Sequence, residues 1–193
     1  MKKYVFLAMI LLLASCAATD EMEETIFVPD VNDSNLPAYT EWGYNSFGAM
    51  YERRYFLATN DIVPCKITYR NGIMTFSLSG RVGTSNMTLC FSFPVNETMK
   101  HYTDLLALHQ KEIDLTDTAC EVSMTTNAST RRITVLSGKL FFQRVQLLRI
   151  NEKDDRVILS GTFDLSFLQN SLPEALTKGR FDVGIANLFI LPD

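Results

Sequence analysis

The sequence predicts one all-β domain, an antiparallel β-sandwich. Two observations predict it. Apolar and polar residues alternate over several short segments, and turn-forming residues separate these segments at regular spacing from Tyr39 to the end of the chain. The same pattern permits a closed or partly open β-barrel, which is the alternative. At most one or two short helices are expected.

The clearest strand signal is KITYRNGIMTFSLS at residues 66–79. Asn71 and Gly72 favour the positive φ angles of a two-residue type I′ turn. With these two residues as the loop, Ile67 pairs with Phe76, and the large apolar side chains of the segment lie on one face. We therefore expect a hairpin in this register.

Alternation of the same kind predicts further half-buried strands. Gly161, inside one of them, is expected at a bulge or at a close approach of two backbones. Residues 98–109 predict one short helix, and Ser171 followed by Pro173 has the pattern of a helix start. The apolar positions of these strands are Met87, Leu89, Phe91, Phe93, Ile133, Val135, Val157, Leu159, Phe163, Leu165, Phe167, Phe181, Val183 and Ile185.

The N-terminus has the organisation of a bacterial export signal. Lys2 and Lys3 precede an apolar run at residues 5–14, which is too short to span a bilayer as a helix. The run leads into LASC at residues 13–16, which resembles the bacterial lipobox and implies cleavage before Cys16 and acylation of its thiol. An ordinary secretory signal is the alternative. We expect a lipoprotein, because several acyl chains such as palmitate hold a protein more firmly than one.

These patterns divide the chain into a signal peptide at residues 1–15, a lipidated cysteine with a flexible acidic tether at 16–38, and one all-β domain at 39–193. Acidic composition with little periodicity predicts the tether. An acidic stretch behind Cys16 resembles the signal that sends lipoproteins of Bacteroides-like bacteria to the outer face of the outer membrane, and a plain spacer is the alternative. We expect the protein at the outer membrane, on either its cell-surface face or its periplasmic face.

Three short motifs occur together in the domain. They are NSFGA at residues 45–49, LSGTFD at 159–164 and KGRFDV at 178–183. Together they resemble a family of uncharacterised all-β lipoproteins from gut and oral Bacteroidetes, whose members have "tFGa", "isGtF" and "GrFDv" strands. The resemblance covers most of residues 43–185 and implies architecture, with no catalytic residues to transfer. In the third motif a cross-strand or turn-stabilising salt bridge is the expected role of Arg180 and Asp182, and a functional pair is the alternative.

Composition argues against several kinds of partner. Without residues 1–15 the chain has 16 basic and 22 acidic residues, so a net charge near −6 disfavours nucleic acid, and there is no polybasic face for anionic lipid. Cys65, Cys90 and Cys120 allow at most one disulfide, and we expect small buried residues rather than a reactive thiol. The cysteines and the two histidines lack metal-site spacing. We expect no metal and no cofactor.

No catalytic arrangement stands out in the sequence. No serine lies in a G-x-S-x-G elbow with an assignable histidine and acid. Asp114 and Asp117, and the acids at residues 152–155, have a glycosidase pair or a calcium loop as alternatives. They lack the EF-hand ligand order, and charged turns are expected instead. We therefore expect the domain not to be an enzyme.

The most suggestive residues for ligand binding are aromatic. Tyr39, Trp42 and Tyr44 begin the domain, and because such rings stack on sugars and favour binding surfaces, they are candidate ligand-binding residues. Burial of the lone tryptophan in the core is the favoured alternative. Thr118, within Asp-Thr-Ala at residues 117–119, fits a short pattern that resembles the O-glycosylation acceptor of Bacteroides-like bacteria.

The expected function is a non-catalytic surface module that binds a glycan or an envelope protein and contacts the membrane through acyl chains on Cys16. One alternative is a structural subunit of a surface assembly or fibre, because the apolar tail at residues 187–193 should pair with another strand. The other alternative is a carboxylate-dependent glycan hydrolase.

Overall fold

The computed structural model describes residues 24–96, 98–126, 129–187 and 189–190, so the predicted signal peptide and Cys16 lie outside the described residues. Within this part of the chain one helix, the 3-10 helix η2 (Tyr102–Leu108), accompanies a twelve-stranded sheet. The all-β fold class and the short helix within residues 98–109 are confirmed.

In these ranges no helix has the length and apolar character needed to cross a bilayer. The strands are β1 (Ser46–Tyr51), β2 (Arg54–Leu57), β3 (Cys65–Arg70), β4 (Ile73–Val82), β5 (Ser85–Pro94), β6 (Lys111–Asp114), β7 (Glu121–Thr126), β8 (Ser129–Arg132), β9 (Thr134–Ile150), β10 (Lys153–Gln169), β11 (Leu172–Ile185) and β12 (Phe189–Ile190).

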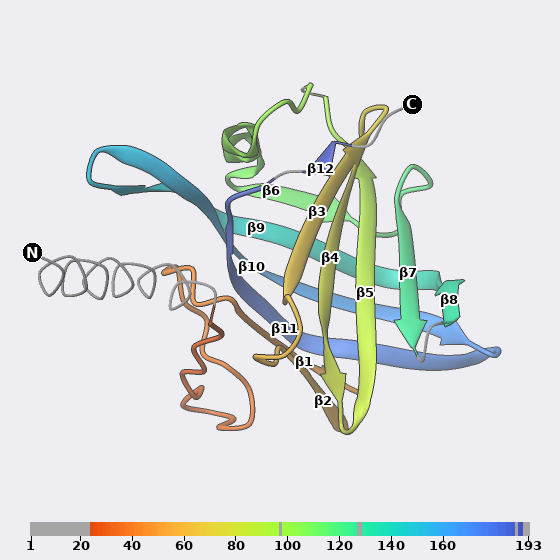
Figure 1. Cartoon of the computed structure of the whole chain (residues 1–193). Helices are drawn as coiled ribbons and strands as arrows, with labels where there is room; N and C mark the ends of the chain where they lie inside the picture. Colours follow the sequence, from red (N-terminus) through yellow and green to blue (C-terminus); the bar gives the residue numbers. More distant parts are fainter. Residues whose placement is uncertain (1–23, 97, 127–128, 188, 191–193) are drawn as a thin grey trace, which may run out of the picture.

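The sheet folds over on itself to give two layers. Its strand order is β6-β9-β10-β11-β1-β2-β4-β5-β7-β8, with β3 beside β4 and the short parallel strand β12 beside β3. In Figure 1, β3, β4 and β5 run steeply in front of β9, β10 and β11, which cross behind them. The two end strands, β6 and β8, are not neighbours in the described sheet, which therefore does not close into a barrel. The fold is an all-β sandwich whose layers cross at a steep angle.

The hairpin of β3 and β4 has the predicted register. Asn71 and Gly72 have φ angles of 49° and 79°, as a type I′ turn requires. Ile67 pairs with Phe76, and both side chains are buried. Local turn chemistry and alternation were sufficient to predict this element.

The helix start expected at Ser171 is wrong, because this segment forms another tight hairpin. Asn170 and Ser171 have φ angles of 50° and 65°, and Gln169 pairs with the first residue of β11. Pro173 lies in the part of β11 that pairs with β10 but not with β1. No second strand therefore requires a hydrogen bond from the N–H that proline lacks.

Phenylalanine rings fill the core between the layers. Phe76 of β4 lies 5.4 Å from Phe142 of β9 and 4.9 Å from Phe181 of β11, measured between ring centroids. All three side chains are fully buried. Such pairs add about 0.5–1.5 kcal/mol each beyond the burial of their area, so these contacts hold the front layer to the back layer.

Residues 26–38 differ from the flexible tether that their composition predicted. The amide of Ile26 donates to the carbonyl of Tyr44 at 2.8 Å, Arg180 of β11 pairs with Asp30 at 2.6 Å, and Leu36 is 0% exposed. The packed domain therefore begins near Ile26 rather than at Tyr39. The buried leucine and the ion pair are non-local contacts that composition does not reveal.

Gly161 lies at the expected bulge. The pairing of β10 with β9 shifts between Ser160 and Thr162. A Cβ atom on Gly161 would lie 2.0 Å from the carbonyl oxygen of Phe141 and 2.6 Å from the ring of Phe181. Because one of these contacts is backbone, the two strands would have to separate to admit a side chain.

We predict that Gly161→Ala lowers the free energy of unfolding by about 1–3 kcal/mol, the usual range for overpacking. Urea denaturation followed by circular dichroism measures the change. Thr162→Ala, at the exposed neighbouring position, is the control and should cost less than about 1 kcal/mol. Equal losses in the two variants would show that the close approach is not the cause.

Candidate functional site

The loop before β1 is built around one buried carboxylate. Asp182 of β11 is 1% exposed, and its two oxygens accept five hydrogen bonds, four of them from the loop of residues 40–44. The donors are the Thr40 hydroxyl at 2.6 Å, the backbone amides of Trp42, Gly43 and Tyr44 at 3.0, 2.8 and 3.2 Å, and the Ser160 hydroxyl at 2.8 Å.

This arrangement compensates the cost of burying a charge. A carboxylate removed from water is tolerated when hydrogen-bond donors replace its hydration shell, and charge-assisted hydrogen bonds are the stronger kind. Consecutive backbone amides can turn toward one anion only if the chain bends, and Gly43 has a φ angle of 75° that suits the bend. The loop is therefore fixed without belonging to a strand.

The side chain of Trp42 points away from the core. It is 72% exposed, so the favoured alternative of a buried tryptophan is wrong. The reason lies in the backbone, because the amides of the loop turn inward to Asp182. Tyr39 and Tyr44, the other two candidate residues, are both half-buried.

Trp42 borders a hollow of about 430 Å³. Tyr39 contributes to the same hollow, whereas Tyr44 does not. Two residues of β9 complete it, and they lie on one face of that strand because they are two positions apart. The lining residues are Tyr39, Thr40, Glu41, Trp42, Arg144 and Gln146.

Hydrogen bonds connect the polar side chains of the hollow. The Tyr39 hydroxyl donates to Glu41 Oε1 at 3.0 Å, and Gln146 Nε2 donates to the carbonyl of Glu41 at 2.6 Å. Arg144 Nε donates to Gln146 Oε1 at 3.1 Å and lies 3.6 Å from Glu41 Oε2. The loop is thus tied to β9 as well as to β11.

The charges in the hollow are balanced. Burial, and next the hydrogen bond to Glu41, raise the pKa of Tyr39 above its ordinary value. The tyrosine hydroxyl therefore remains protonated as a donor, while the Glu41 carboxylate and the Arg144 guanidinium carry opposite charges. Beside an exposed indole face, the site offers donors and acceptors together, which suits an uncharged ligand with several hydroxyl groups.

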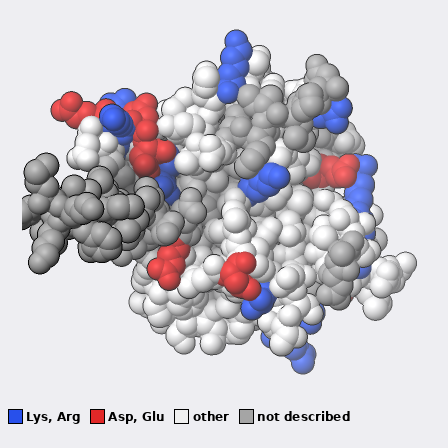
Figure 2. Space-filling model, in the orientation of Figure 1, with Lys and Arg blue, Asp and Glu red and all other residues white. Residues whose placement is uncertain are grey.

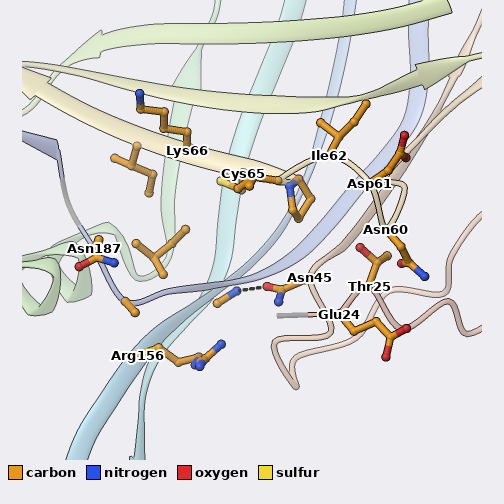
Figure 3. Close-up of a pocket in the computed structure, with 16 residues that line it drawn as sticks. Glu24, Thr25, Asn45, Asn60, Asp61, Ile62, Cys65, Lys66, Arg156 and Asn187 are labelled. Atoms are coloured by element: carbon orange, nitrogen blue, oxygen red, sulfur yellow. Dashed lines mark hydrogen bonds between the residues drawn. The ribbon is translucent and has the colours of Figure 1, made fainter. Parts of the chain in front are cut away.

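A larger cleft of about 690 Å³ lies between the β2–β3 loop and the C-terminal end of β11 (Figure 3). Asn45 Oδ1 accepts a hydrogen bond from the amide of Gly184 at 3.0 Å, drawn dashed in the figure. Glu24 and Asp61 line this cleft, and Asp61 pairs with Arg81. Sequence reasoning missed the cleft, because no motif marks the loops that form it.

Two of the acids considered in the sequence, Asp114 and Asp117, hold turns. Asp114 Oδ1 accepts from the hydroxyl and the amide of Thr116 at 2.7 and 2.9 Å, and these bonds hold the pKa of Asp114 below its usual value. Asp117 Oδ1 accepts from the amide of Ala119 at 2.9 Å. These acids therefore stabilise local turns.

The remaining candidate residues are placed as follows. Thr118 is exposed in the turn after β6, where it is accessible to modification. Cys65, Cys90 and Cys120 are free thiols, and burial raises the pKa of Cys65. Within the described ranges, His, Cys, Asp and Glu do not form a group of three or more that could hold a metal ion.

We predict that Asp182→Asn lowers the free energy of unfolding by about 2–4 kcal/mol, because an amide turns an NH₂ group toward donors that need an acceptor. The fluorescence of Trp42 should change with the released loop. Urea denaturation and emission spectra measure both effects. The control is Asp164→Asn, at an exposed aspartate of β10, which should change stability by about 0.5 kcal/mol or less. A wild-type stability for Asp182→Asn would contradict the structural role of the carboxylate.

No match to this chain is found among known protein families, characterised proteins or solved structures. The resemblance to the Bacteroidetes lipoproteins therefore stays a prediction. Independently of it, the contacts of Asp182 give the aspartate of the third motif a structural role.

Proposed function

We propose that this chain is a lipoprotein of the bacterial cell envelope whose domain binds a glycan, without catalysis, at the hollow beside Trp42. The exposed indole on a fixed loop is the observation that carries the proposal. A flat aromatic face is a stacking platform for the apolar face of a sugar ring. Because Asp182 already holds the loop, little conformational entropy is lost on binding.

The polar groups around the indole support a sugar as the ligand. Sugar hydroxyls both donate and accept, and the hollow supplies a carboxylate acceptor in Glu41, guanidinium donors in Arg144 and an amide in Gln146. A small concave site with a few convergent polar groups is typical of small-ligand recognition. A protein partner would bury roughly 800 Å² of surface on each side. The hollow, with a volume of about 430 Å³, is a small concave site rather than a surface of that extent.

The anchor is part of the same proposal. Acylation of Cys16 would place the domain at the outer membrane, and the described chain starts at Glu24, only eight residues later. A glycan-binding domain held at that surface would concentrate saccharides near the cell, and several acyl chains would prevent dissociation. Membership of the Bacteroidetes lipoprotein family that the three motifs resemble belongs to this proposal.

Two observations weaken the alternatives. β12, within the apolar tail, pairs with Thr68 and Tyr69 of β3 in the same chain, which removes the reason to expect a strand donated to another subunit. A glycan hydrolase needs two converging carboxyl groups. Asp114 and Asp117 instead hold exposed turns, and Asp154 and Asp155 form ion pairs with Arg149 and Arg156.

We predict that Trp42→Ala weakens glycan binding while leaving the free energy of unfolding unchanged, since the side chain is exposed. A glycan array on the purified mature protein identifies a ligand, and calorimetric titration with that ligand measures affinity. We expect a loss of at least about tenfold, equivalent to 1.4 kcal/mol. Trp42→Phe should retain part of the affinity because it keeps a ring.

Leu172→Ala is the matched control, because Leu172 is a large exposed apolar residue at the β10–β11 turn, away from the hollow. It should bind like the wild type. Unchanged binding by Trp42→Ala, or an array on which the wild type gives no more signal than Trp42→Ala, would contradict the proposal.

A further inference from the structure

The segment that leads toward Cys16 exposes a series of apolar side chains. We call these the apolar rim: Ile26, Phe27, Val28 and Val31, all of them exposed, with Val31 at 97%. In Figure 2 the charged side chains are scattered over the visible face and do not gather into one large patch. Exposed apolar side chains that gather in one segment often mark an interaction site.

The backbone of the rim is fixed to the domain. Besides the bond from Ile26 to Tyr44, the amide of Ala38 donates to the carbonyl of Val28 at 2.6 Å, and the amide of Asp30 donates to the carbonyl of Leu36 at 2.9 Å. The apolar side chains are therefore held in place at the surface, and their exposure is a property of the folded domain.

The acids that flank Val31 are neutralised. Asp30 lies 2.6 Å from Arg180 Nη1, and Asp33 lies 3.4 Å from Lys178 Nζ, both cations belonging to β11. Removing a paired charge from water costs less free energy than removing an isolated one. The rim can therefore approach an apolar phase without burying an unpaired carboxylate beside Val31.

Chain length places the rim close to the membrane. Seven residues, 17–23, separate Cys16 from Glu24. Fully extended, this link spans roughly 28 Å at most. A tethered surface meets the bilayer at a high effective concentration, so that even a weak apolar contact is populated.

We infer that the apolar rim inserts into the interfacial region of a bilayer with zwitterionic headgroups and so orients the domain on the membrane. This inference rests on the proposed lipidation of Cys16. Val31, Phe27 and their neighbours supply apolar area, whose removal from water favours insertion. The β10–β11 hairpin, which lies at the opposite side of the domain from this segment in Figure 1, then points away from the bilayer.

A tryptophan reporter tests the inference. Because Trp42 is the only tryptophan of the chain, Trp42→Phe provides a background in which Val31→Trp or Leu172→Trp adds a single emitter at an exposed position. Each full-length lipidated variant is reconstituted in phosphatidylcholine vesicles, with or without bromine on the acyl chains. We expect brominated lipid to quench most of the emission of Val31→Trp and little of that of Leu172→Trp. Adding Phe27→Ser to the Val31→Trp variant should weaken the quenching.

Other outcomes overturn the inference in distinguishable ways. Protein that floats with the vesicles but shows equal or absent quenching for the two reporters is anchored without the rim in the bilayer. If the protein does not float with the vesicles, both the lipidation of Cys16 and the insertion of the rim are contradicted. The proposed glycan binding is tested by a separate experiment and is not affected by this result. A blue shift of Val31→Trp in lipid-free solution that grows with protein concentration would assign the rim to contact with a second copy.

Discussion

The buried carboxylate of Asp182 is the constraint on which the rest of the site depends. An uncompensated charge in a protein interior costs several kcal/mol, and here five donors compensate it, three of them backbone amides of one loop. If the loop left, Asp182 would lose four of its five hydrogen-bond donors and keep only the Ser160 hydroxyl. Its conformation is therefore selected by electrostatics, and the outward direction of Trp42 is a consequence.

The strand that carries Asp182 serves both sides of the sheet. Phe181 and Val183 point into the core, while the alternate positions face the N-terminal segment. On that second face Arg180 pairs with Asp30, Asp182 holds residues 40–44, and the amide of Gly184 donates to Asn45. One strand therefore organises the hydrophobic core, the proposed glycan site and the segment that bears the apolar rim.

The sequence predicted the features that local chemistry determines. The turn at Asn71 and Gly72, the alternating strands and the bulge at Gly161 each follow from residues close together in the chain. The helix start predicted at Ser171 is wrong because the pairing of β10 with β11, a non-local interaction over the length of both strands, favours a hairpin there.

The site could be predicted only in part. Tyr39 and Trp42 were recognised by residue type, but Thr40 and Asp182 are 142 positions apart, and nothing in either neighbourhood indicates that they meet. Arg144 and Gln146 were missed for the same reason, since Gln146 contacts Glu41 from 105 positions away in the chain. Whether Trp42 is buried or exposed depended on these distant contacts, so the expectation that a lone tryptophan is buried was wrong.

Amide hydrogen exchange measured by NMR tests the central claim most directly. If Asp182 accepts hydrogen bonds from the loop, the amides of Trp42, Gly43 and Tyr44 should exchange as slowly as those of the paired strand β11, although they belong to no strand. Exchange of these three amides at the rate of an unprotected loop, in a domain whose strands remain protected, would contradict the account.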